Sequence, residues 1–122
     1  MEIESSGNWV RASLAGEIDM YWLQSQREQV DRLCDEQFAH VVLDLEAVTF
    51  MDSTGLGLIA RLCTLCRPRN GCVYVVRPNE TVLKALEIVG LTEQSGVEIA
   101  ETAAKAAIVD QRWTESKVSN TF

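Results

Sequence analysis

Apolar residues occur along the chain either in short consecutive runs or at helical spacing. Runs of consecutive apolar residues are typical of strands that are covered on both faces of a sheet. These runs, with a roughly alternating segment near the start, predict strands at about residues 9–18 (one or two strands), 40–45, 72–76 and 97–99. Strands that alternate with helices favour an α/β sandwich with a partly parallel sheet, and the strand-rich start favours a mixed sheet.

The helical spacing predicts four helices. They cover about residues 20–36, 53–67, 81–89 and 101–112. We expect Asp19 to cap the first helix and Ser53 or Thr54 to cap the second. Their side-chain oxygens can accept hydrogen bonds from the unpaired N–H groups of a first turn. Pro68 should end the second helix, and Gly90 should lie just past the end of the third.

The chain of 122 residues has the length of one domain, and its 47% of hydrophobic residues is typical of a globular protein. We expect a single domain over residues 1–122, with a frayed tail at 113–122. The formal net charge of −7 disfavours binding to nucleic acid or to an anionic membrane surface. The acidic, polar start is unlike a signal peptide, and no apolar run approaches the roughly eighteen residues of a membrane span. We therefore expect a cytoplasmic protein.

Four cysteines invite a redox or metal interpretation. Cys63 and Cys66 have the spacing of a C-x-x-C motif, but a structural zinc needs four ligands. No second pair has matching spacing, and His40 is the only histidine. Because both cysteines fall on the apolar face of a predicted helix, we interpret them as small buried hydrophobic residues. A redox role is the alternative.

The second predicted helix has more apolar surface than a sheet alone would cover. On a helical wheel its apolar residues span an arc of roughly 220°, whereas a helix on a sheet needs little more than about 100°. Either a neighbouring helix covers the surplus, or Leu58, Leu62 and Leu65 form an apolar shoulder for a partner. The sequence leaves both possibilities open.

The candidate chemistry lies in the turn Asp52–Gly55, between a predicted buried strand and this helix. The turn places the hydroxyl of Ser53 at or near a helix N-terminus, where unpaired N–H groups and the helix dipole favour negative charge. A phosphate there would be tolerated by its own chain and felt strongly by a docked partner. We interpret Ser53 as a phosphorylation switch; the alternative is that Ser53 is only a helix cap.

An enzymatic role finds little support in the same turn. A serine hydrolase would need a glycine two residues before its nucleophile, where Met51 stands. His40 begins the strand that leads to the turn, so a catalytic pair with Ser53 lacks support. Gly55 and Gly57 lack the third glycine of a dinucleotide site and the lysine of a Walker motif. We expect no catalytic residue.

Three parts of the chain carry motifs of a known family. They are Leu14–Asp19, Val41–Leu45 with Phe50–Gly57, and Arg77–Pro78 with Val82–Leu91. Together they resemble the STAS domain family, and within it most closely the bacterial anti-sigma factor antagonists. The resemblance covers about residues 9–110. It implies an α/β STAS fold, with a mixed sheet of four or five strands and about four helices.

The resemblance also implies a function. The chain would bind an ATP-dependent anti-sigma serine kinase and so free a sigma factor. The kinase would then phosphorylate Ser53 and release this chain. A phosphatase acting on phospho-Ser53 would reverse the change. ATP and Mg²⁺ would belong to the kinase, so we expect no cofactor here. The partner-facing surface would consist of residues from the strand ends and the second helix. The resemblance implies Asp19, Asp52, Ser53, Thr54 and Gly55, and we add Leu58 and Arg61 of the second helix as expected partner-binding residues.

The chain departs from the family pattern at Tyr21 and Trp22, where small or polar residues are more frequent, so partner choice is expected to differ. Two further functions stay open. The domain could be a non-phosphorylated subunit of a larger lipid-transport or stressosome-like assembly. It could also be a redox-regulated interaction module that uses Cys63 with Cys66, or Cys34 with Cys72.

Overall fold

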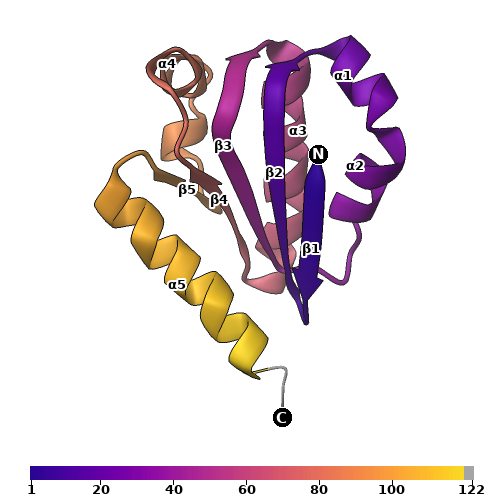
Figure 1. The fold of residues 1–122 in the computed structure, drawn as a ribbon, viewed down its shortest axis with the longest axis vertical. Helices are drawn as coiled ribbons and strands as arrows, with labels where there is room; N and C mark the ends of the chain where they lie inside the picture. Colours follow the sequence, from indigo (N-terminus) through magenta and orange to yellow (C-terminus); the bar gives the residue numbers. More distant parts are fainter. Residues whose placement is uncertain (120–122) are drawn as a thin grey trace.

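A computed structural model describes residues 1–119 and shows a five-stranded sheet (Figure 1). The strands, which lie in the order of the chain, are β1 (Glu2–Ser6), β2 (Trp9–Ile18), β3 (His40–Met51), β4 (Cys72–Val76) and β5 (Val97–Ala100). β1 is antiparallel to β2, and the other neighbours are parallel. The expected mixed α/β sheet is confirmed. β1 was not predicted because Ile3 is its only apolar residue.

Four helices follow parallel strands and lie on one face of the sheet (Figure 1). They are α1 (Met20–Ser25), α2 (Arg27–Leu33), α3 (Ser53–Cys66) and α4 (Glu80–Ile88); short 3₁₀ turns follow α3 (Arg67–Arg69) and α4 (Leu91–Glu93). Each parallel connection moves one strand onward in the same direction, so right-handed crossovers put all these helices on one side. α5 (Ala103–Ser119) follows the last strand and covers part of the opposite face.

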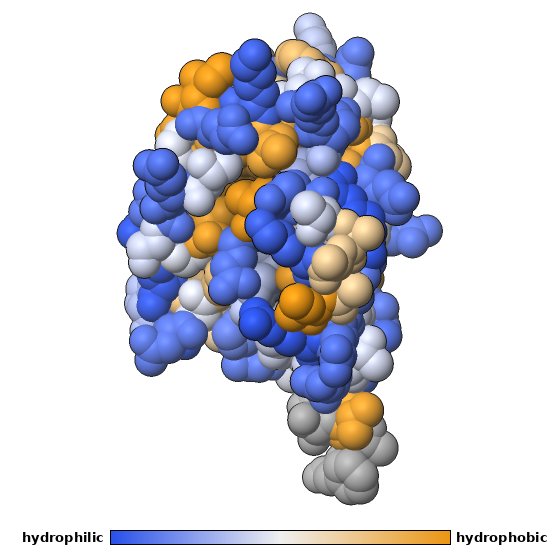
Figure 2. Space-filling model, turned by 90° about the vertical axis from the view of Figure 1, so that its left-hand side faces the viewer, coloured by the Kyte–Doolittle hydropathy of each residue, from blue (hydrophilic) through white to orange (hydrophobic). Residues whose placement is uncertain are grey.

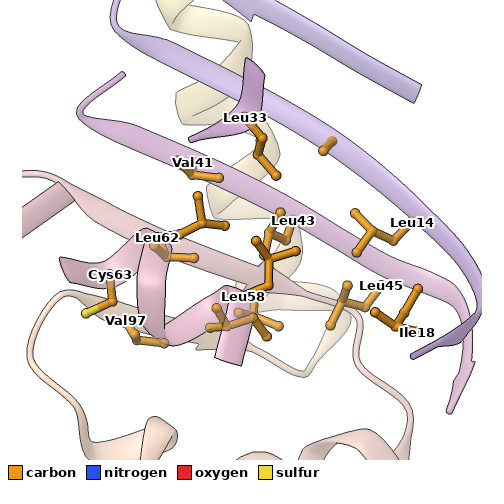
Figure 3. Close-up of a cluster of buried hydrophobic side chains, with 14 of the residues drawn as sticks. Leu14, Ile18, Leu33, Val41, Leu43, Leu45, Leu58, Leu62, Cys63 and Val97 are labelled. Atoms are coloured by element: carbon orange, nitrogen blue, oxygen red, sulfur yellow. The ribbon is translucent and has the colours of Figure 1, made fainter. Parts of the chain in front are cut away.

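The main core lies between the sheet and the helices α1–α4 (Figure 3). Inward-facing residues of β2 and β3, such as Leu14 and Leu43, meet Leu58 and Leu62 of α3 there. Val41, Val42 and Leu43 are all almost fully buried, as the run of consecutive apolar residues predicted. A smaller core lies between β3, β4 and α5.

Two predicted helices have different limits in the structure. The helix expected over residues 20–36 is interrupted at Gln26 and becomes α1 and α2. Apolar residues from both pieces reach the same core, so the apolar spacing gave no sign of the break. The expectation of a frayed tail is wrong for residues 113–119, because α5 continues to Ser119 and the side chain of Trp113 is buried. Residues 120–122 of that tail lie outside the described residues.

A network of ion pairs links α5 to the strands of the sheet. Asp44 of β3 accepts a hydrogen bond from Arg11 of β2 at 2.8 Å and lies 3.4 Å from Arg77, which also pairs with Asp110 of α5. These four residues come from β2, β3, the position after β4 and α5, and their pairs link these parts of the fold. The Asp44 side chain is only 13% exposed, so this network is partly shielded from water.

An aromatic cluster lies on the same face of the sheet, where the parallel strands begin. The ring of His40 stacks on Trp9, with centroids 4.5 Å apart, and Trp9 stacks on Tyr74 at 5.5 Å. The guanidinium of Arg112 lies 5.7 Å from the centre of the Tyr74 ring, so α5 contributes a cation–π contact. Burial, together with the positive charge of Arg112, lowers the pKa of His40.

Candidate functional site

Ser53 lies where β2 and β3 end side by side. Ile18 and Met51 are paired at the end of the two strands, and the backbone N–H of Asp52 donates to the carbonyl of Ile18 at 3.2 Å. Asp19 and Asp52, which follow these strands, therefore come together although 33 positions separate them in the sequence. β3 reaches this point because it continues to Met51, beyond the expected end at residue 45. After Leu45 only Val48 and Met51 are buried, so the run of consecutive apolar residues stops there and the extension was not predicted.

Each of these aspartates caps the helix that follows it. Asp19 accepts a hydrogen bond from the N–H of Trp22 at 2.9 Å, as expected. Asp52 accepts one from the N–H of Thr54 at 2.8 Å, so the prediction that Ser53 or Thr54 caps α3 is wrong. Ser53 is instead the first residue of the helix, and it is exposed. Its hydroxyl makes no side-chain hydrogen bond with a described residue, so capping does not occupy it.

The two glycines of the turn have different surroundings. Gly55 is buried, and a Cβ added there would lie 2.9 Å from Cγ2 of Ile18 and in conflict with Met51. The absence of a side chain at Gly55 thus lets α3 start close against the two strand ends. Gly57 is exposed, and a Cβ there would meet nothing within 4 Å.

The predicted site residues divide into accessible and inaccessible groups. Ser53 and Arg61 are exposed, and Asp19, Asp52 and Thr54 are half-buried. Leu58, by contrast, is only 6% exposed and belongs to the main core.

The apolar shoulder that Leu58, Leu62 and Leu65 could have offered is not present. Leu62 is buried with Leu58, and Leu65 is half-buried against the same core. Leu56 also packs against this core, so the surplus apolar arc of α3 is covered within the domain.

Large exposed apolar residues lie near the strand ends that lead to Ser53; Tyr21 was expected to affect partner choice, whereas Met20 and Phe50 were not named from the sequence. Tyr21 is 81% exposed, Met20 is 58% exposed, and Phe50 is 45% exposed. Each of them lies within three positions of the paired residues Ile18 and Met51. The available signal was the presence of large apolar residues directly at a strand end and at the start of a helix.

The cysteines lie in the fold as the hydrophobic interpretation predicted for Cys63 and Cys66, which are both buried. Burial raises the pKa of Cys66 to about 11 and that of Cys72 to about 12, and it also raises the pKa of Cys34. Reactive thiols need the opposite shift, toward thiolate. Among residues 1–119, no three His, Cys, Asp or Glu side chains are grouped so that they could hold a metal ion.

A groove of about 530 Å³ lies elsewhere, along β5 between α4 and α5. It is lined by apolar residues such as Leu83 and Ile108 and by charged residues, and none of the predicted site residues lines it. Figure 2 views the molecule from the side of α4 and α5, where hydrophilic side chains interrupt the apolar surface. In the described part of the chain, every helix is too short or too polar to cross a bilayer.

Comparison with known proteins gives this arrangement a family context. The STAS domain family matches residues 1–106. An anti-sigma-B factor antagonist of Bacillus subtilis (strain 168) is 29% identical over 93 residues, which cover 76% of this chain and 84% of that protein. An anti-sigma F factor antagonist of Paenibacillus polymyxa is 33% identical over 92 residues, which cover 75% of this chain and 79% of that protein.

Similarity of structure extends over nearly the same length. The Bacillus cell fate determinant SpoIIAA, solved in its phosphorylated form, matches this chain with a TM-score of 0.65 at 22% sequence identity. The match covers 91% of this chain and 97% of SpoIIAA, which shows a shared fold. Fold, family match and sequence relatives agree, and the chain belongs to the STAS domain family.

Proposed function

We propose that this protein is an anti-sigma factor antagonist that binds an ATP-dependent anti-sigma serine kinase and is switched off when that kinase phosphorylates Ser53. The observation that carries the proposal is the state of Ser53. It is exposed at the first position of α3, and Asp52 rather than Ser53 caps the helix. The names of the sequence relatives support the same function.

In the phosphorylation reaction this chain would supply only the acceptor hydroxyl. The Oγ atom of Ser53 would attack the γ-phosphorus of ATP, lose its proton to a base of the kinase, and leave ADP as the other product. The kinase would supply ATP, Mg²⁺ and the base. This chain would supply an accessible hydroxyl at a helix N-terminus, where the helix dipole favours the new negative charge. It would act as an interaction protein rather than as an enzyme, in the cytoplasm, and a phosphatase would restore it.

The charge that a phosphate adds is large enough to act as a switch. A phosphate carries about −1.5 to −2 charges at pH 7. Against one acidic group about 6 Å away, at an effective dielectric constant near 20, the repulsion is roughly 4–6 kcal/mol. Solvent and salt reduce this, but half of it still weakens binding about 30-fold or more. The β-phosphate of ADP, left in the kinase after transfer, is a negative group of the required kind.

We assign to the partner-binding surface those predicted residues whose side chains are exposed or half-buried. It contains Asp19, Asp52, Ser53 and Thr54, and Arg61 lies further along the exposed side of α3. Gly55 serves this surface indirectly, because it sets the position of the α3 N-terminus. Leu58 is left out because it is buried.

Phosphorylation and binding can be tested with the same proteins. The purified chain is incubated with candidate anti-sigma kinases and Mg²⁺–ATP, and the modified residue is mapped by mass spectrometry. We expect one phosphate, on Ser53, and none on the Ser53→Ala variant. Calorimetry should show that Ser53→Ala binds the kinase like the wild type and that Ser53→Asp binds at least tenfold more weakly.

A control separates the local charge from the change in net charge. Ser5 is exposed on β1, and β1 is separated from β3 by β2. Ser5→Asp adds the same charge there and should bind like the wild type. If phosphate appears only on other residues, or if Ser53→Asp binds normally, the switch is refuted. An unphosphorylated chain that remains stably bound in a larger assembly would favour the structural-subunit alternative.

A further inference from the structure

We infer that Tyr21 is the apolar anchor of the kinase complex, so that the partner carries an apolar pocket beside the site that receives Ser53. This inference rests on the proposed function and adds to it the residue that supplies affinity. Tyr21 is 81% exposed, the largest exposed fraction among the large hydrophobic residues of the described part of the chain. A tyrosine this exposed offers a large apolar ring with a polar end, which is the type of residue that dominates interface energetics.

The position of Tyr21 places it within reach of a partner on Ser53. Three steps along the chain lead from Ile18 to Tyr21, and two lead from Met51 to Ser53. Because Ile18 and Met51 are paired, five Cα–Cα steps and one strand spacing limit the separation to about 24 Å. An interface of ordinary size covers about 800 Å² on each partner, or about 32 Å across. A kinase that reaches Ser53 can therefore cover Tyr21.

The surroundings of Tyr21 hold it in place before a partner arrives. The Asp19 carboxylate fixes the first turn of α1 through the N–H of Trp22. Trp22 and Leu23 pack against the main core, so α1 is attached on its inner side while Tyr21 stays outside. A side chain on an anchored turn loses less backbone freedom on binding than one on a loose loop.

Exposed apolar neighbours extend the surface. One exposed hydrophobic residue needs no explanation, because folded proteins show many. Here Met20 and Phe50 are exposed at the same paired strand ends as Tyr21. Exposed apolar residues near the strand ends that lead to Ser53 are what a docking partner on Ser53 could use.

The test measures binding to the kinase that phosphorylates the wild type. With ADP present, we expect Tyr21→Ala to raise the Kd at least tenfold and Tyr21→Phe to stay within threefold of the wild type, since the ring does the packing. With saturating Tyr21→Ala, kcat for phosphorylation should be unchanged and KM raised. Val118 is also more than half exposed, but near the far end of α5 (Figure 1), so Val118→Ala should bind normally.

The outcomes separate this inference from the proposed function. If Tyr21→Ala binds within twofold of the wild type while Ser53→Asp loses binding, the anchor is refuted and the switch stands. If no anti-sigma kinase binds or phosphorylates the wild type, both are refuted. The urea midpoint of each variant verifies folding; it should not move for Tyr21→Ala, and Met20→Ala offers a second variant on the same surface if it does.

Discussion

Gly55 lies directly against Met51: a Cβ added to Gly55 would stand 3.1 Å from the sulfur of Met51 and closer still to its Cγ. The first turn of α3 and the last residue of β3 thus occupy space that a methyl group would need. Gly57, two residues later, has open space around it. The two glycines should therefore respond in opposite ways to the same substitution.

Gly55→Ala should lower the free energy of unfolding by about 1–3 kcal/mol, because the added methyl group overpacks the strand ends. Gly57→Ala should raise it by about 0.5–1 kcal/mol, because alanine favours the helix and meets no neighbour. Urea unfolding followed by circular dichroism measures both values. Equal effects of the two substitutions would contradict the assigned packing.

Removal of the Asp52 side chain should weaken the start of α3. Asp52→Ala loses the hydrogen bond to the N–H of Thr54 and should cost about 1 kcal/mol of stability, whereas Asp52→Asn keeps an acceptor and should cost less. Ser53→Ala should change stability by less than about 0.5 kcal/mol, because its hydroxyl does not cap the helix. A large loss for Ser53→Ala in the same unfolding experiment would restore the view that Ser53 is a cap.

Asp44 should matter more for stability than an exposed acidic residue of the same kind of pair. Asp44→Ala leaves Arg11 and Arg77 without their shared carboxylate, and we expect a loss of about 1–2 kcal/mol after allowance for their partial exposure. The control is Glu101→Ala, which breaks a surface pair with Lys105 and should cost less than about 0.5 kcal/mol. Similar losses in thermal unfolding would show that the network contributes nothing special.

His40 should make stability depend on pH. Burial and Arg112 lower its folded pKa below the ordinary value of 6.5, so at pH values just below 6.5 the unfolded chain binds a proton that the folded chain does not. The wild type should therefore lose stability as the pH falls from about 7 toward 5.5. His40→Gln, which does not titrate, should lack this component. Denaturant unfolding at several pH values compares the two proteins; parallel curves would argue against a shifted His40.

The thiols should react slowly in the folded protein. With a pKa of about 11, Cys66 is thiolate in only about one molecule in a thousand at pH 8, and it is also buried. We expect a thiol reagent such as dithionitrobenzoate to modify the chain quickly only after denaturant is added. Rapid labelling of native protein, or a change in kinase affinity after mild oxidation, would revive the redox-module alternative.

The predictable parts of the fold are those in which burial of successive side chains leaves a regular apolar pattern in the sequence. Val41, Val42 and Leu43 are covered on both sheet faces, and their consecutive apolar character showed it. β1 was not predicted because a polar strand at a sheet edge has no such apolar pattern. The break at Gln26 was not predicted because α1 and α2 both direct apolar residues to one core.

The site was predictable where chain connectivity decides it. A strand that ends in Asp52-Ser53 before an apolar helix put Ser53 at a helix start, and the structure has it there. Which oxygen caps the helix was not predictable, because Asp, Ser and Thr all cap well. The burial of Leu58 and the exposure of Met20 depend on which neighbours cover each surface, and that is decided by tertiary packing.

The strand order, which repeats the order of the chain, has a consequence for synthesis on the ribosome. Every strand after the first emerges when the neighbour it will pair with has already left the exit tunnel, so the sheet can grow at one border and no strand has to be inserted between two others. Ser53 leaves the ribosome directly after β3, when β3 and its partner β2 are both available. Its immediate setting can therefore be assembled before β4 and β5 have been translated.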